Sequence, residues 1–198
     1  MRIFVTGAPG FIGSALVPEL IQAGHQVLGL TRSEAGAEKL RRAGAEVLHG
    51  NIEDLDSLRR GAADSDGVIH LAFNHDFSQF QKNADDDRKA IVAMGEVLLR
   101  SHRPFVITSG TAIAANVDGK PSTEDGPTAS WNPRAASEAA VKELTARGVN
   151  TSVCGCRRFT THASKGWCPI FSLWRARRAF QSTSATAAIA GRRRTFPT

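Results

Sequence analysis

Three glycines near the start of the chain form a pattern suited to binding a phosphate-containing ligand. Gly7, Gly10 and Gly13 recur at a spacing of three, between an apolar run at residues 3–5 and a helical pattern. Glycine permits a sharp turn and a close approach of backbone N–H groups to a ligand, and a helix N-terminus attracts an anion. The spacing is one residue longer than the fingerprint G-x-G-x-x-G, and plain turns also contain such glycines. Because a strand precedes the pattern and a helix follows it, we interpret it as a dinucleotide-binding turn. The predicted pyrophosphate contacts are Gly7, Gly10, Phe11, Ile12 and Gly13.

The second predicted strand ends in residues that favour one form of the dinucleotide. Thr31, Arg32 and Ser33 follow an apolar run, and no acidic residue lies between positions 28 and 33. An acid at this place would bind the ribose hydroxyls of NAD, whereas an arginine binds the 2′-phosphate of NADP. We therefore expect NADP to be preferred over NAD, with Arg32 as the phosphate ligand and Thr31 or Ser33 as a hydrogen-bond partner. A solvated arginine in a surface loop is the alternative.

Later strand ends supply the remaining candidate site residues. Asn51 and Ile52 follow the third strand, where an adenine would lie, and Ala72 follows the fourth, near the nicotinamide ribose. Ser109 follows the fifth strand, where a hydroxyl can donate to a substrate carbonyl and polarise it. Thr111 is the second choice for this catalytic role.

Three other polar groups receive structural interpretations. His70 lies in an apolar run and is interpreted as a core histidine with satisfied hydrogen bonds. His75 and Asp76 leave the end of the same strand and either face a substrate or fill a polar loop. The three aspartates at residues 85–87 are expected to form a solvated face of a long helix.

Alternating strand and helix patterns must position these residues. The predicted strands cover residues 3–5, 26–30, 46–49, 67–71, 104–108 and 149–153. The predicted helices cover residues 11–23, 34–42, 55–60, 80–101 and 134–147. This alternation is typical of an α/β fold with a Rossmann-like, doubly wound parallel sheet. Since the carboxyl ends of parallel strands meet at one edge, we expect the candidate residues to gather there.

These motifs resemble those of the short-chain dehydrogenase/reductase superfamily, in its extended or atypical branch of NAD(P)-dependent epimerase/dehydratase-like proteins. The resemblance rests on T-G-A-P-G-F-I-G at residues 6–13, N-I-E-D at 51–54, H-L-A at 70–72 and I-T-S-G-T-A at 107–112. It covers about three quarters of the chain. It implies an oxidoreductase that transfers a hydride to or from a small carbonyl or alcohol substrate.

The resemblance breaks at the residues that move the proton, for which the family usually has a Tyr-x-x-x-Lys pair. The chain contains no tyrosine, and the corresponding segment R-A-A-S-E places Arg134 at the tyrosine position and Glu138 at the lysine position. An NAD(P)-dependent oxidoreductase is expected if Arg134, Glu138 or a loop histidine replaces the pair, or if the substrate needs only an oriented hydride. The alternative is a non-catalytic NADP-binding sensor or interaction module.

Composition narrows the classes of partner and compartment. The chain of 198 residues has a net charge of +6, but nine of its 25 Lys and Arg lie in residues 151–198, which contain no acid. Residues 1–150 therefore carry 16 basic and 19 acidic side chains, a net charge of −3 that does not indicate nucleic-acid binding. We recognise no secretory signal and no membrane-spanning run, and three cysteines do not make a disulfide framework. We expect a cytoplasmic protein with a small-molecule substrate and no metal, and leave a homodimer open.

The end of the chain differs in composition from the rest. Residues 154–198 contain clustered arginines, all three cysteines and no acid. Read one nucleotide earlier, the codons of residues 153–158 can encode V-R-L-P-P, which is similar to what relatives of this family carry after the sixth strand. We therefore hypothesise that residues 154–198 are a basic, poorly ordered tail translated out of frame. Residues 1–153 would then form the NAD(P)-binding Rossmann domain, with a truncated or non-native C-terminal substrate lobe.

Overall fold

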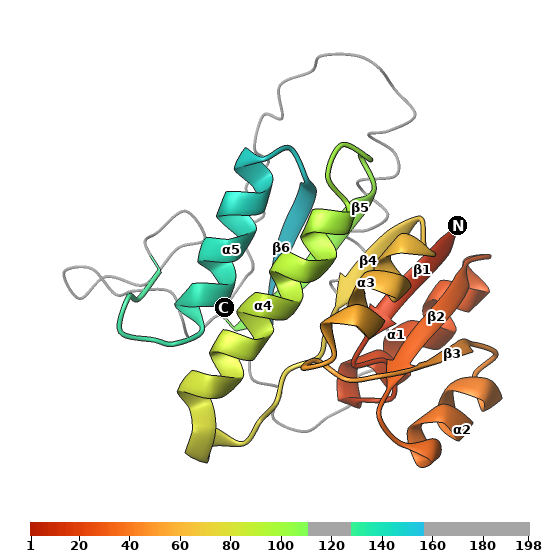
Figure 1. The fold of residues 1–198 in the computed structure, drawn as a ribbon. Helices are drawn as coiled ribbons and strands as arrows, with labels where there is room; N and C mark the ends of the chain where they lie inside the picture. The colour runs from red at the N-terminus through yellow and green to blue at the C-terminus, as the bar shows by residue number, and fades with distance from the viewer. Residues whose placement is uncertain (111–127, 157–198) are drawn as a thin grey trace, which may run out of the picture.

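A parallel β-sheet forms the centre of the computed structural model, which describes residues 1–110 and 128–156. Within these ranges the sheet has six strands in the order β3-β2-β1-β4-β5-β6, each parallel to its neighbours (Figure 1). The strands are β1 (Arg2–Thr6), β2 (Gln26–Thr31), β3 (Glu46–His49), β4 (Gly67–His70), β5 (Pro104–Gly110) and β6 (Asn150–Cys156). The helices are α1 (Phe11–Gln22), α2 (Glu34–Arg42), α3 (Leu55–Ala63), the short η1 (Phe77–Gln79), α4 (Phe80–Val97) and α5 (Ala135–Ala146). The predicted Rossmann-like fold is confirmed.

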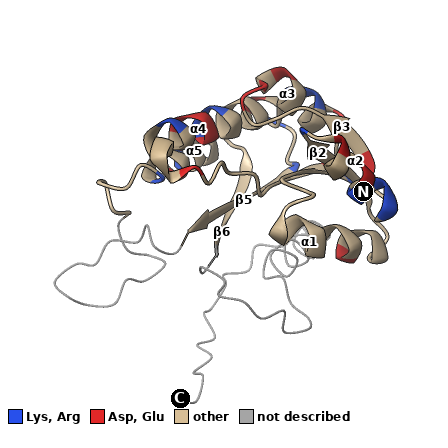
Figure 2. Ribbon diagram, turned by 90° about the horizontal axis from the view of Figure 1, so that it is seen from below, with Lys and Arg blue, Asp and Glu red and all other residues tan. Residues whose placement is uncertain are grey.

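Helices cover both faces of this sheet. Figure 2 shows α3, α4 and α5 on one face and α1 on the other. Alternate residues of β1 point to opposite faces, so Phe4 packs with Ile91 and Met94 of α4, whereas Ile3 packs with Leu16 of α1. The two buried clusters hold the carboxyl ends of the strands at one rigid edge.

Most predicted elements are confirmed to within a few residues, and four ends differ by two residues or more. Helix α3 continues to Ala63 beyond its predicted end at residue 60. Helix α4 ends at Val97 rather than at residue 101: the N–H groups of Leu98 and Leu99 bond to carbonyls three residues back, and Arg100 then has a φ of 59°, in the left-handed region, so the helix does not resume. Strands β5 and β6 extend to Gly110 and Cys156, because their parallel pairing continues to these residues. Ser109 therefore lies inside a strand.

Some predictions fall on residues outside the described ranges. These are Thr111 and the part of the predicted basic tail from residue 157 onward. Among the helices of the described part of the chain, none combines the length and the apolar character needed to cross a membrane.

Candidate functional site

A groove of about 630 Å³ opens at the carboxyl edge of the sheet. Its walls come from four strand ends: the glycine turn after β1, Arg32 after β2, Asn51 after β3 and Ala72 after β4. The strand order reverses between β1 and β4, and open α/β sheets bind their ligands at such a reversal. The fold thus brings predicted site residues from four separate segments to one place.

The glycine turn requires glycine at two positions. Gly7 has a φ of 67°, and a Cβ there would lie 2.8 Å from the amide nitrogen of Ala72. A Cβ at Gly13 would lie 2.3 Å from the carbonyl oxygen of Ala8, because α1 packs directly on the turn. No side chain caps α1 at Gly10, and its first turn contains no acid. Within residues 1–110 and 128–156, neither a side-chain cap nor an acid of the first turn neutralises the positive end of the helix, as an anion site requires.

The five predicted pyrophosphate residues have different positions. Gly7 and Gly10 line the groove, whereas Gly13 is buried beneath the turn. Ile12 packs against the core, and the Phe11 side chain is 78% exposed. Since the side chains of Phe11 and Ile12 do not line the groove, any contact from these two residues must come from their backbone.

The end of β2 and the helix that follows it present two cations to the groove. Arg32 and Lys39 both line it. Lys39 lies in the last turn of α2 and not at a strand end, so it was not among the predicted site residues. Ser33 Oγ accepts a hydrogen bond from the N–H of Gly36 at 3.2 Å and so caps α2. Thr31 is buried, and its hydroxyl bonds to the backbone of Ser33. The two predicted hydrogen-bond partners of the phosphate therefore already hold internal contacts.

The loop after β3 lines the next part of the groove. Asn51 and Ile52 are both exposed to it. The side-chain oxygen of Asn51 accepts hydrogen bonds from the N–H groups of Glu53 at 2.7 Å and Asp54 at 3.0 Å. The loop is thus held in one conformation by its own asparagine.

Ser109 and Glu138, two of the predicted catalytic residues, contact each other, and neither belongs to the lining of the groove. Ser109 is 6% exposed, and its Oγ donates a hydrogen bond to Glu138 Oε1 at 2.9 Å. Glu138 lies in the first turn of α5, and its other oxygen accepts from the hydroxyl of Thr128 at 2.9 Å. A carboxylate in this position can take up a proton through Ser109, whereas the lysine usual at this position is a cation.

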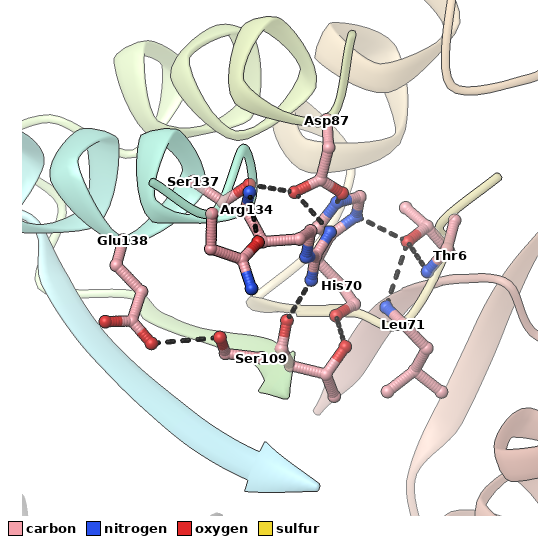
Figure 3. A network of polar contacts seen from close by, with 11 residues as sticks. Thr6, His70, Leu71, Asp87, Ser109, Arg134, Ser137 and Glu138 are labelled. Carbon is pink, nitrogen blue, oxygen red and sulfur yellow. Dashed lines mark hydrogen bonds and ion pairs between the residues drawn. The ribbon is translucent and has the colours of Figure 1, made fainter. Parts of the chain in front are cut away.

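Arg134 occupies the tyrosine position with a guanidinium that is held on three sides (Figure 3). Its Nη1 lies 2.9 Å from Asp87 Oδ2, and its Nη2 donates to the carbonyl oxygen of Thr108 at 3.1 Å. The guanidinium carbon lies 4.0 Å from the centre of the Phe73 ring, a cation–π contact. Arginine stays protonated in proteins and cannot act as a proton acceptor. The contacts of Arg134 therefore indicate a structural role in place of the proton-moving role considered from sequence.

Asp87 corrects the prediction of a solvated acidic face. It is 1% exposed, and its Oδ2 accepts a hydrogen bond from Ser137 Oγ at 2.6 Å in addition to the ion pair with Arg134. Burial raises the pKa of the Asp87 carboxyl, but the hydrogen bond from His70 and the charge of Arg134 outweigh it, so the pKa lies below its ordinary value. The preceding aspartate, Asp85, is exposed as predicted.

His70 is confirmed as a core histidine with satisfied hydrogen bonds. It is 1% exposed, and its Nδ1 lies 2.6 Å from Thr6 Oγ1 while its Nε2 lies 3.1 Å from Asp87 Oδ1. The ring therefore bridges β1 and α4 inside the protein.

In the loop after β4, His75 and Asp76 have different positions: one faces the groove and the other makes contacts within the loop. His75 lines the groove. Asp76 instead caps η1, because its Oδ1 accepts from the hydroxyl and the N–H of Ser78, and these hydrogen bonds lower the pKa of Asp76. Within the described ranges, no group of three His, Cys, Asp or Glu side chains is placed to hold a metal ion.

Comparison with known sequences gives matches over most of the chain. Residues 3–165 match the NAD dependent epimerase/dehydratase family. An uncharacterized protein of Schizosaccharomyces pombe is 54% identical over 124 residues, which are 63% of this chain and 42% of that protein. An uncharacterized protein of Saccharomyces cerevisiae is 50% identical over 113 residues, 56% of this chain and 38% of that protein. A UDP-glucose 4-epimerase of Streptomyces lividans is 31% identical over 154 residues, 72% of this chain and 46% of the enzyme. The chain thus spans less than half the length of these relatives.

Solved structures show the same fold. One is the UDP-glucose 4-epimerase of Thermotoga maritima, crystallised with UDP-glucose, which is 25% identical in sequence and has a TM-score of 0.63. The match covers 77% of this chain and 53% of the epimerase chain. The enzyme of the same name from Thermus thermophilus, in complex with NAD, is 21% identical with a TM-score of 0.64 over 83% of this chain and 59% of its own. The second likeness concerns the fold alone.

Proposed function

Because the chain belongs to the NAD dependent epimerase/dehydratase family, we propose that its groove binds a nicotinamide dinucleotide and prefers NADP to NAD. The observation that carries the proposal is the groove lining: an uncapped helix N-terminus at Gly10 and two cations, Arg32 and Lys39, border the same cavity. NADP carries a pyrophosphate and a 2′-phosphate, and these two anions match the two positive features. NAD carries only the first.

The residues around the groove fit such a ligand. The glycine turn lets a pyrophosphate approach the backbone closely, because Gly7 and Gly10 line the groove and carry no side chain. Among the described residues, no hydrogen bond or ion pair engages the guanidinium of Arg32. Glu53 also lines the groove, but Lys82 Nζ lies 2.9 Å from its Oε1 and offsets its charge. A phosphate near Arg32 therefore meets a net positive surface.

Replacing Arg32 by alanine is expected to weaken NADPH binding about thirtyfold and to leave NADH binding unchanged. A charge-assisted hydrogen bond contributes roughly 1.5–3 kcal/mol, and only NADPH has the 2′-phosphate that would form it. Isothermal titration of both ligands against both proteins measures the difference.

The matched control for this titration is Arg42→Ala. Arg42 lies at the end of α2, pairs with Glu38 and does not line the groove. We expect it to bind both ligands as the unchanged protein does. Equal affinity of the unchanged protein for NADPH and NADH would remove the NADP preference, and binding of neither would remove the proposed function.

For the reaction, we propose hydride transfer to or from a small carbonyl or alcohol substrate. The bound nicotinamide would supply or accept the hydride. Because the Ser109 hydroxyl hydrogen points to Glu138, the free lone pair of Ser109 Oγ can accept a hydrogen bond from a substrate alcohol. During oxidation the alcohol proton would pass to Ser109 Oγ while Ser109 passes its own proton to Glu138, and reduction would reverse both transfers.

Glu138→Gln and Ser109→Ala are each expected to lower kcat/KM about a hundredfold and to leave NADPH affinity unchanged. Each removes one step of proton transfer, and general acid–base groups typically contribute about 10²–10⁴ in rate. The assay follows reduced nicotinamide with a panel of secondary alcohols and ketones, and separates the UDP-sugar products when UDP-glucose is the substrate, because a 4-epimerisation causes no net change of the nicotinamide. UDP-glucose is included because the relatives at 31% identity are named UDP-glucose 4-epimerases.

The matched control is Glu143→Gln, an exposed glutamate on the same helix that should retain full activity. Full activity of Glu138→Gln would exclude the carboxylate from the reaction.

A second candidate function is NADP binding without turnover, as a sensor or interaction module. The specific observation in its favour is Arg134, whose guanidinium is engaged by Asp87 and the Thr108 carbonyl at the place of the usual tyrosine. NADPH binding with no turnover of any panel member would favour this function. A cytoplasmic location, a homodimer and a small-molecule partner remain parts of the proposal.

A further inference from the structure

The hydroxyl of Thr6 lies where the glycine turn meets the end of β4. Its Oγ1 accepts hydrogen bonds from the N–H groups of Leu71 and Ala72, both at 3.2 Å (Figure 3). Gly7, the next residue, is so close to this segment that a Cβ on it would lie 2.8 Å from the Ala72 nitrogen. Gly7 and Ala72 both line the groove. The Thr6 hydroxyl and the backbone bond from the Leu71 N–H to the Thr6 carbonyl oxygen together hold these two walls of the groove, and of these contacts only the hydroxyl reaches Ala72.

The position of the hydroxyl hydrogen follows from counting donors and acceptors. A hydroxyl has two lone pairs and one hydrogen, and both N–H groups approach the lone pairs of Thr6 Oγ1, although the Leu71 N–H is shared with the Thr6 carbonyl oxygen at 3.2 Å. Its hydrogen must then go to Nδ1 of His70, which lies 2.6 Å away. Nδ1 is thus an acceptor, and the ring proton is on Nε2, which donates to Asp87 Oδ1 at 3.1 Å. Every hydrogen bond in this chain of groups runs from Thr6 toward Asp87.

Asp87 anchors the far end of this chain of hydrogen bonds. Its second oxygen is held by Ser137 Oγ at 2.6 Å and by Arg134 at 2.9 Å, both from the segment that begins α5. Thr6, His70, Asp87 and Ser137 are all at most 2% exposed, so water does not compete for these bonds. Rotation of the Thr6 hydroxyl is therefore opposed by a continuous buried network.

We infer that Asp87 and His70 are positioning residues for the dinucleotide site, which act through the Thr6 hydroxyl to hold the phosphate-binding turn against Ala72. The inference rests on the proposed function. It assigns to this network the half of the site that receives the pyrophosphate, and not the half near Arg32 that receives the adenosine 2′-phosphate.

The test compares two ligands on Thr6 variants. Thr6→Val keeps the shape but removes the hydroxyl, and Thr6→Ser keeps the hydroxyl. NADPH reaches both halves of the site, whereas adenosine 2′-phosphate lacks the pyrophosphate. We expect Thr6→Val to weaken NADPH binding about tenfold, from the loss of one buried hydrogen-bonding group, and to leave adenosine 2′-phosphate binding unchanged. Thr6→Ser should bind both ligands within about twofold of the unchanged protein.

Thr151→Val is the matched control, because Thr151 is a buried threonine of β6 whose hydroxyl bonds to Thr145. It should bind NADPH as the unchanged protein does. If Thr6→Val weakened the binding of NADPH and of adenosine 2′-phosphate equally, the result would indicate general damage to the fold and overturn the inference. Unchanged NADPH binding by Thr6→Val would also overturn it. Failure of the unchanged protein to bind either ligand would instead remove the proposed function itself.

A double-mutant cycle separates a connected network from two independent defects. Asp87→Asn alters the far end of the network, and NADPH affinity is measured for Thr6→Val, Asp87→Asn and the two together. If Thr6 and Asp87 both act through His70, the affinity of the double variant for NADPH should be no lower than that of the single variant that binds NADPH less tightly. Losses that multiply would show that the two residues act separately and would overturn the inference.

Discussion

Replacing Gly13 by alanine is expected to weaken NADPH binding about a thousandfold. The new Cβ would lie 2.3 Å from the Ala8 oxygen and 2.5 Å from the Gly7 oxygen, and both are backbone atoms that cannot rotate away. The turn must therefore move from the helix N-terminus. Loss of two charge-assisted hydrogen bonds to a pyrophosphate, each roughly 1.5–3 kcal/mol, corresponds to a factor of about 10³ in affinity.

Gly110→Ala is the matched control for this substitution. A Cβ at Gly110 has no atom within 4 Å among the described residues, so NADPH affinity should change by less than about twofold. Titration calorimetry gives the affinities, and urea unfolding of the same samples shows whether each variant is folded at the titration temperature. A folded Gly13→Ala protein with unchanged affinity would exclude the turn as the pyrophosphate site.

Replacing Asp87 by alanine is expected to lower the free energy of unfolding by about 3–5 kcal/mol, the usual cost of breaking a buried ion pair from one side. The substitution leaves the buried guanidinium of Arg134 without its carboxylate and removes the acceptor of His70 and Ser137. Urea denaturation measures the change. Asp85→Ala, on the exposed face of the same helix, should change the free energy of unfolding by no more than about 0.5 kcal/mol.

The same carboxylate should make stability depend on pH in the acidic range. The pKa of Asp87 is lowered in the folded protein, and its ordinary value is about 3.9. A group with a lowered pKa contributes stability above its unfolded value and loses that contribution as the pH falls toward the folded pKa. Below about pH 4 the stability of the unchanged protein should therefore fall more steeply than that of Asp87→Asn. Parallel pH curves would contradict the role given to this charge.

Local patterns were sufficient to predict the fold and several of the residues that line the groove. Strands and helices have different hydrophobic periods, and a parallel sheet brings the carboxyl ends of its strands to one edge. The sequence therefore placed Gly7, Arg32, Asn51 and Ala72 around one groove, and the structure has all four in its lining. Lys39 was not predicted as a groove residue because it lies at the end of a helix and not at the end of a strand.

The buried polar network could not be predicted in the same way. A run of three aspartates is usually solvated, and only the rotation of α4 against the sheet and α5 decides which of them turns inward. Asp87 lies four residues before Ile91 and seven before Met94, both fully buried, so its place on the apolar stripe was a signal available in the sequence. Its partners were not available, because His70 and Ser137 lie 17 and 50 residues away along the chain.

By itself, then, the sequence determined the Rossmann-like sheet, the glycine turn and the absence of the usual tyrosine, because each depends on residues close together in the chain. The tertiary structure alone decided that Arg134 is held by Asp87 and that Ser109 donates to Glu138. These contacts arise where α4, α5 and β5 pack together, and the free energy of burying a charge requires a partner that only packing can supply.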